Sequence, residues 1–238
     1  RLDDKDLFYA LCLHDALLNL PTEKHTLPEL TEKWVSLHTN ANVALRVEST
    51  GDAYLGLVLD APSEKLAEAV SLLSEYVTDP LFDRTTLSRI FSNASHFRNR
   101  MIRGGNSTAL LLATRALTQA GRYNDCFAGE NAYRRLTELA NAFDDHADAL
   151  VEGMTRVWKQ LTDNARPLLY FIGDEETYKS WKNAAAALPV ARAVTPKPSC
   201  TLEPLPHRNY ALTIPGEVNY CAEVYDLSDV GIAYSPKL

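Results

Sequence analysis

Two adjacent glycines, Gly104 and Gly105, lie in the stretch of this sequence whose residue types most resemble a phosphate-binding loop. Asn106, Ser107 and a long apolar run follow them. A P-loop has the pattern GxxxxGK[ST] after a strand, so that backbone N–H groups and a lysine reach the phosphates. Here the preceding residues are typical of a helix and no lysine follows, and the GxGxxG pattern of dinucleotide-binding folds is also missing. We interpret the stretch as a corner between two helices, with an anion-binding loop as the alternative.

The corner interpretation gives each of these residues a structural role. Gly104 or Gly105 takes the left-handed position that ends the first helix. Asn106 or Ser107 then caps the next helix by accepting from its free N–H groups, which contributes about 1 kcal/mol.

Histidines and carboxylates do not form a metal-binding motif in the sequence. No two of the six histidines are within five positions of one another, which excludes both HExxH and HxxEH. His14-Asp15 and the stretch 144–148 (Asp-Asp-His-Ala-Asp) are the local clusters, and the second lies at a predicted helix start, where aspartate is a good cap. We expect this chain to bind no metal or other cofactor, and we assign no catalytic residue.

Nucleophile motifs are also missing, since no GxSxG occurs. A triad assembled in space stays open. Arg98, Arg100 and Arg103 lie at the end of a predicted helix, where positive charge is favourable. We interpret them as a solvated face; contact with a peptide or a partner domain is the alternative and makes them the candidate site residues.

Composition narrows the class of protein. The chain of 238 residues has a net charge of −7 and 46% hydrophobic residues, which fits a globular protein and argues against nucleic acid or an anionic membrane as the main partner. No apolar window is long enough for a membrane span, and the charged residues 1–6 do not resemble a signal peptide. We expect a soluble fragment of a longer protein, with an intracellular or organellar location favoured over secretion and the compartment unknown.

The four cysteines are far apart, at positions 12, 126, 200 and 221. We expect buried free thiols, with a disulfide or a metal role as the alternatives.

Hydrophobic periodicity predicts a helical protein with one hairpin. Apolar residues at helical spacing predict helices over 6–20, 27–38, 64–78, 83–103, 107–120, 130–143 and 146–161, and a short helix ending near 188. A period of two predicts a β-hairpin from Val43–Val47 and Leu55–Leu59 around Gly51-Asp52, with one face covered. The run Leu168–Ile172 predicts a buried strand. Residues 189–215 carry six prolines and are typical of an extended linker, and residues 216–238 open with a strand-like pattern.

The order of these elements resembles the repeat unit of the pitrilysin/insulinase-type (M16) zinc metallopeptidases, in particular the presequence-protease branch. The segments that carry the resemblance are "LPELTEKWVSLHTNANVALRVES", "SEKLAEAVSLLSEYVTDPLFDRTTLSRI", "IRGGNSTALLLATRAL" and "EVNYCAEVYDL". The resemblance implies an α+β fold in which helices pack on one face of a mainly antiparallel sheet. It divides the chain into a third-repeat-like domain with a helical region (1–188), the proline-rich linker (189–215) and the first strand of a truncated following repeat (216–238).

The family's zinc motif, HxxEH with a distal glutamate, belongs to its first repeat and has no match here. The arginine and tyrosine that its last repeat offers to substrate would lie beyond Leu238, and residues 104–106 lack the histidine of the family's corner pattern. The resemblance therefore implies a non-catalytic part of the C-terminal half of a zinc endopeptidase, inactive alone. Its expected partners are the N-terminal catalytic half of the same protein, which holds the zinc, and a peptide substrate. A non-catalytic interaction or assembly subunit of the same fold and an unrelated α+β binding domain are the alternatives.

Overall fold

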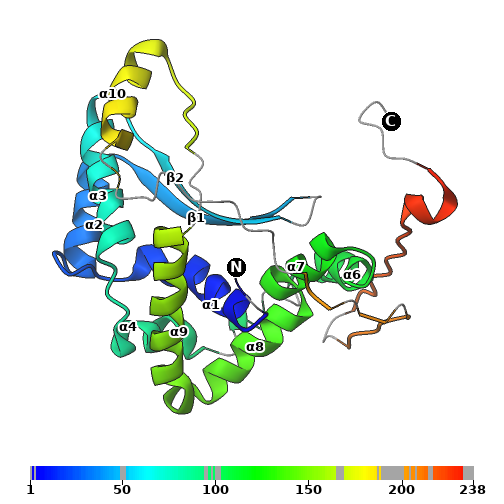
Figure 1. Ribbon diagram of the computed structural model, residues 1–238. Coiled ribbons are helices and arrows are strands. Elements are labelled where there is room, and N and C mark those ends of the chain that lie inside the picture. Colours follow the sequence, from blue (N-terminus) through cyan, green and yellow to red (C-terminus); the bar gives the residue numbers. More distant parts are fainter. Residues whose placement is uncertain are drawn as a thin grey trace. The chain divides into compact units, whose positions relative to one another are not determined.

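Helices form most of the regular structure of the chain, together with one two-stranded antiparallel hairpin (Figure 1). The computed structural model describes residues 2, 4–48, 52–93, 96–97, 99, 103–164, 169–186, 188, 201–203, 205–206, 208–213 and 217–232. The helices are α1 (Asp4–Ala16), α2 (Leu27–Ser36), α3 (Leu66–Thr78), α4 (Arg84–Phe91), α6 (Gly105–Thr114), α7 (Gln119–Ala128), α8 (Glu130–Asn141), α9 (Phe143–Asn164) and α10 (Glu175–Ala186), and the strands are β1 (Asn40–Val47) and β2 (Ala53–Asp60). The fold is therefore a mainly helical α+β arrangement, as the sequence predicts.

Contacts divide the described residues into two compact units. The first contains the described residues of 1–46, 54–90 and 143–198, and the second those of 47–53, 91–142 and 199–238.

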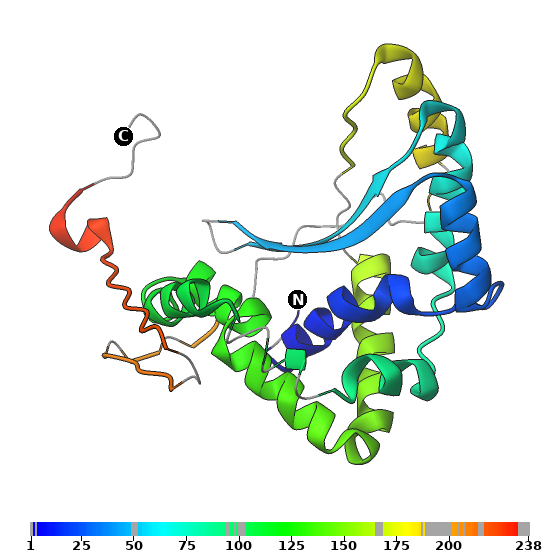
Figure 2. The ribbon, with the colours of Figure 1, turned by 180° about the vertical axis from the view of Figure 1, so that it is seen from behind.

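The first unit has an apolar core between α2 and α3, which lie side by side (Figure 2). Leu30 of α2 and Tyr76 of α3 are fully buried, and the Trp34 indole stacks on the Tyr76 ring with 6.3 Å between the ring centroids. The residues of this core recur every three or four positions along each helix, which is why their apolar sides face each other. On another side of α3 lies α10, as Figure 1 shows.

The start of α2 is fixed by the residues that predict it. Thr26 donates its backbone N–H and its hydroxyl to the Glu29 carboxylate at 2.8 and 2.7 Å, and Pro28 occupies the first turn. This arrangement satisfies an N–H group that has no partner within the helix.

A second helix pair of the first unit, α1 and α9, carries an ion pair in which only the aspartate is buried. The Asp6 carboxylate is 5% exposed and lies 2.6 Å from the Arg156 guanidinium. Where the two helices meet, Gly153 packs against the ring of Tyr9, which leaves no room for a Cβ atom.

The predicted hairpin is confirmed, but its cover is incomplete. The Glu48 N–H donates to the Asp52 carbonyl at 2.8 Å next to the turn. Leu55, Leu57 and Leu59 share one face of β2 and are half-buried, whereas Tyr54 and Val58 on the other face are 44% and 40% exposed. No strand residue is fully buried, so neither face of this hairpin is closed by the described part of the chain.

The prediction of a buried strand over 168–172 is wrong for the described residues 169–172. They form no strand, and the side chains of Tyr170 and Ile172 are 82% and 100% exposed. Phe171 alternates to the other side and packs on Trp181 of α10, with 5.4 Å between the ring centroids. The run is apolar enough for a buried strand, but among the described residues no strand lies beside it.

Two predicted helices have other boundaries in the structure. The helix expected over 83–103 ends at Phe91, because the Asn93 side chain accepts from the His96 N–H at 3.1 Å and starts a new turn. The helix expected over 107–120 is divided into α6 and α7. Thr118 caps α7 by accepting from the Gly121 N–H at 2.9 Å, so Gly121 lies in the first turn of a helix rather than closing one.

Candidate functional site

The glycine corner is the start of a helix, and the described structure gives its glycines a packing role. Gly105 is the first residue of α6, and the Thr108 N–H donates to the Gly104 carbonyl at 2.8 Å. The ring of Tyr220 lies where a Cβ atom of Gly105 would be. The second glycine therefore leaves room for an aromatic ring.

The detailed roles predicted for the corner are wrong. Gly104 has a φ of −92°, and Gly105 also lacks a positive φ, so neither adopts the left-handed conformation. Asn106 and Ser107 lie inside α6, and no side chain caps this helix. Glycine here serves close packing against Tyr220, which no local sequence pattern reveals.

Of the three arginines predicted to contact a peptide or partner, only one can be placed. Arg103 immediately precedes the corner and is exposed. Arg98 and Arg100 lie outside the described residues. The contact site formed by the three arginines therefore stays a prediction.

The local His/carboxylate clusters form structural pairs. The His14 imidazole lies 2.8 Å from the Asp15 carboxylate. At the start of α9, Asp144 and Asp148 lie 2.9 and 3.6 Å from the guanidinium of Arg84, on the exposed surface. Among the described residues no group of three or more His, Cys, Asp or Glu side chains could hold a metal ion.

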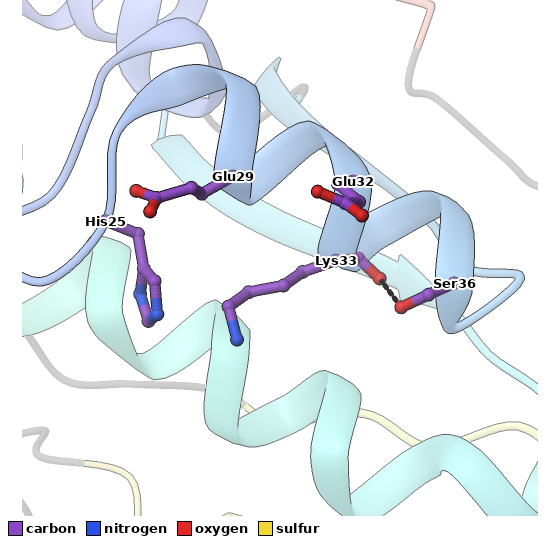
Figure 3. A pocket seen from close by; sticks show the side chains of 5 residues that line it. All are labelled: His25, Glu29, Glu32, Lys33 and Ser36. Atoms are coloured by element: carbon purple, nitrogen blue, oxygen red, sulfur yellow. Dashed lines mark hydrogen bonds between the residues drawn. The ribbon is translucent and has the colours of Figure 1, made fainter.

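A pocket in the first unit lies beside α2, and its polar groups are largely engaged in holding the fold (Figure 3). It is lined by His25, Glu29, Glu32, Lys33 and Ser36. The His25 ring lies 2.8 Å from the Glu75 carboxylate of α3, and Glu29 accepts the two bonds that begin α2. His25 and Glu29 are therefore engaged in holding the fold.

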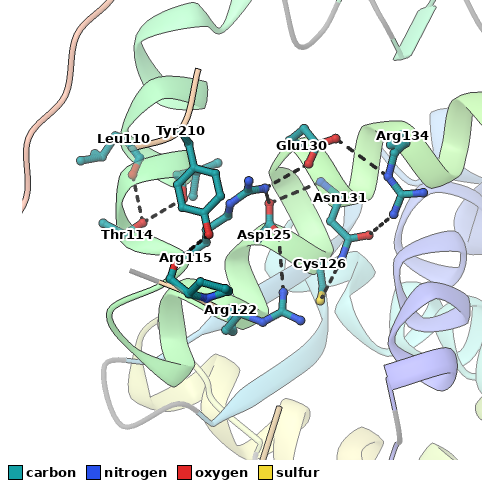
Figure 4. A network of polar contacts seen from close by, with 12 residues as sticks. Leu110, Thr114, Arg115, Arg122, Asp125, Cys126, Glu130, Asn131, Arg134 and Tyr210 are labelled. Atoms are coloured by element: carbon teal, nitrogen blue, oxygen red, sulfur yellow. Dashed lines mark hydrogen bonds and ion pairs between the residues drawn. The ribbon is translucent and has the colours of Figure 1, made fainter. Parts of the chain in front are cut away.

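The densest polar network lies in the second unit, around Asp125 of α7 (Figure 4). Asp125 is 1% exposed. Its carboxylate lies 3.6 Å from the guanidinium groups of both Arg115 and Arg122, and it accepts from the Asn131 N–H at 3.3 Å. Burial raises the pKa of Asp125 above 3.8, although the Asn131 hydrogen bond and the two arginines oppose that shift.

Arg115 connects this network to a distant part of the sequence. Its guanidinium lies 3.0 Å from the Glu130 carboxylate and stacks over the Tyr210 ring, 4.2 Å from the centroid. Arg122 donates to the Glu203 carbonyl at 3.1 Å. The network therefore holds α6, α7 and α8 together and also contacts the chain beyond residue 200.

Sequence reasoning missed these residues because they lie at unremarkable spacings. Arg115, Arg122, Asp125 and Glu130 form an ordinary mixture of charges on helix ends. The available signal was weak: Arg122 and Asp125 are three positions apart, which places them on one helix face.

The cysteine prediction is confirmed in part. Cys12 and Cys126 are buried free thiols, whereas Cys221 is free but exposed. Cys200 lies outside the described residues. No helix of the described chain combines the length and apolar character needed to cross a membrane.

A scan against models of known protein families gives no match, and a search of curated proteins finds no relative.

Proposed function

We propose that this chain is a non-catalytic segment of the C-terminal half of a pitrilysin/insulinase-type zinc endopeptidase. In this proposal it helps form the closed chamber that binds peptides, and the N-terminal half of the same protein holds the zinc and cleaves the substrate. Residues 1–188 are then the third repeat with its helical region, 189–215 the linker and 216–238 the first strand of the following repeat. The helices lie on one face of a mainly antiparallel sheet that the rest of the protein completes.

The incomplete sheet is the observation that carries the proposal. A two-stranded hairpin needs further strands or packing against a helix to be stable in water. Leu59 of this hairpin packs on the α2–α3 core, but Tyr54 and Val58 on the other face are exposed, as are Tyr170 and Ile172 of the apolar run 169–172. Exposed apolar strands are aggregation sites unless further strands or helices cover them. These features support a chain that forms part of a larger sheet.

The three arginines near the glycine corner are proposed to make contacts and not to take part in catalysis. Arg103 is exposed next to the glycine corner, and with Arg98 and Arg100 it is the proposed contact for peptide or for the partner half. None of the three is assigned a catalytic role, and no step of the reaction passes through this chain.

The same exposed apolar residues of the hairpin and of the run 169–172 also favour a second candidate, a non-catalytic interaction or assembly subunit of this fold. In that case the whole protein would lack HxxEH and would not cleave peptides. The two candidates therefore differ in whether the whole protein cleaves peptides. Both require that other parts of the assembly cover the exposed apolar residues.

The test substitutes the exposed apolar run 169–172 in the whole protein that contains this chain. Tyr170→Lys combined with Ile172→Lys places two charges where the proposal requires a buried sheet, and we expect loss of cleavage of a quenched-fluorescent, unstructured peptide. Val35→Lys is the matched control, because Val35 is 68% exposed on a helix whose backbone is already paired. Unchanged cleavage by the double variant would contradict the proposal, and absence of cleavage by the unmodified whole protein would favour the assembly subunit.

A further inference from the structure

A side chain of α7 binds the backbone of the segment that follows residue 200. The Gln119 amide donates to the Leu202 carbonyl at 2.8 Å and accepts from the Leu202 N–H at 2.9 Å. This pair of bonds has the donor and acceptor arrangement that a neighbouring β-strand would offer to one residue. Arg122 continues the contact by donating to the Glu203 carbonyl. All three bonds are made to the main chain and so do not depend on the side chains of the bound segment.

Two side chains of the segment are anchors. Leu202 is 3% exposed although the structure assigns its segment no helix or strand. The Tyr210 ring contacts two guanidinium groups, with Arg115 4.2 Å and Arg208 5.1 Å from the ring centroid. Cations stacked on aromatic faces are attracted by the ring quadrupole. The segment is thus bound at an aliphatic and an aromatic position eight residues apart.

The receptor side of this contact is held in place before the segment binds. Arg115 is 12% exposed and is fixed by Glu130 at 3.0 Å and by Asp125 at 3.6 Å. Arg122 is fixed by the same aspartate. The buried carboxylate therefore orients Arg115 toward the Tyr210 ring (Figure 4) and Arg122 toward the Glu203 carbonyl. Groups oriented in advance lose little entropy on binding.

We propose that the α6–α7 corner is a binding site for a looped polypeptide segment, and that the segment of this chain that carries Leu202 and Tyr210 is its resident occupant. The site recognises the backbone through Gln119 and Arg122, and it selects an aliphatic side chain followed by an aromatic one. It lies wholly within the second unit. This inference does not rest on the proposed function, since the site needs no zinc and no partner half.

The experiment adds the segment as a separate peptide. In the full chain, Leu202→Ser combined with Tyr210→Ser removes both anchors of the resident segment, and a fluorescein-labelled peptide TLEPLPHRNY is titrated by fluorescence anisotropy. We expect the peptide to bind this variant. We expect its affinity for the unmodified chain to be lower by a factor of about ten or more, because the tethered segment competes at a high effective concentration.

Variants of Gln119 test whether backbone recognition causes the binding. Gln119→Leu, added to the anchor variant, should abolish peptide binding, whereas Gln119→Glu keeps the acceptor for the Leu202 N–H and should weaken it less. A peptide in which serine replaces Leu202 and Tyr210 is the matched control and should not bind. No binding to the anchor variant, or binding that Gln119→Leu leaves unchanged, would overturn the proposal.

A measurement on the otherwise unmodified chain keeps the proposal testable if the anchor variant does not fold. Hydrogen exchange of the Leu202 amide should be protected in the unmodified chain and in Gln119→Glu, and fast in Gln119→Leu. Fast exchange of this amide in the unmodified chain would show that the segment does not occupy the site, and would overturn the proposal.

Discussion

The α2–α3 pair of the first unit and the α7–α8 pair of the second are stabilised in different ways. Tyr76 and Trp34 stack within a wholly apolar group, with one weak bond from the indole N–H to the Tyr76 hydroxyl at 3.4 Å. Between α7 and α8, a buried carboxylate, Asp125, is surrounded by arginines and a backbone N–H. An apolar contact tolerates small shifts, whereas a buried charge requires every partner in place. The second unit should therefore be more sensitive to loss of a single polar atom.

The largest effect should follow from removal of the fully buried ring in the first unit. Tyr76→Ala should lower the free energy of unfolding by about 4 kcal/mol, because it removes an aromatic side chain from a packed core. All three tryptophans lie in the first unit, so tryptophan fluorescence during urea unfolding measures this unit. Tyr76→Phe is the control and should cost only about 1 kcal/mol. Equal costs for the two variants would mean that the hydroxyl, and not the ring, holds the pair.

The matching change in the second unit is Asp125→Ala. It should lower the free energy of unfolding by about 3 kcal/mol, because Arg115 and Arg122 lose the carboxylate that balances them in a buried site. Hydrogen exchange of amides in α7 and α8 measures this unit, which contains no tryptophan. Asp145→Ala, at an exposed position of α9, should change stability by less than about 0.5 kcal/mol. A cost for Asp125→Ala as small as this control would show that the network contributes little.

A smaller effect is expected where Tyr220 covers Gly105. Gly105→Ala adds a Cβ atom in the space of the ring, so the ring must move although alanine favours the helix. In a double-mutant cycle with Tyr220→Ala, Gly105→Ala should be destabilising alone and neutral or stabilising in the Tyr220→Ala background, with a coupling of about 1 kcal/mol. Additive effects would remove Tyr220 as the reason for glycine at this position.

The smallest effects concern pH and have opposite signs in the two units. Hydrogen bonds from Thr26 hold the pKa of Glu29 below 4.5, so its contribution to stability is present above that pH and is lost as the pH falls through the lowered pKa. Burial raises the pKa of Asp125 above 3.8, so the folded unit binds that proton more tightly and its contribution falls as the pH rises through the raised pKa.

Urea unfolding at a series of pH values, for Glu29→Gln and Asp125→Asn beside the unmodified chain, measures both slopes. The gain in the free energy of unfolding over the Glu29→Gln variant should be larger at higher pH. The gain over the Asp125→Asn variant should be larger at lower pH. An Asp125 advantage that grows with pH would mean that the two arginines outweigh burial.

The two units also differ in how much the sequence reveals of them. Helical spacing of apolar residues predicts the helices that contain Trp34 and Tyr76, although not that these two side chains meet, and Thr26 with Glu29 predicts where α2 begins. The two hydrogen bonds between the Gln119 amide and the Leu202 backbone could not be predicted, because they join residues 83 positions apart. The run 169–172 has the composition of a buried strand but is exposed. The composition of a segment indicates its preference for a strand, whereas its burial depends on a neighbouring strand.

The central claim is that this chain supports a zinc peptidase without itself holding the catalytic centre. The most direct test is to measure, by mass spectrometry, the zinc bound to the purified chain and to the whole protein that contains it. The account predicts about one zinc per molecule of the whole protein and none held by the chain alone after dialysis. Stoichiometric zinc on the chain alone, or a whole protein free of zinc when supplied with it, would contradict the account.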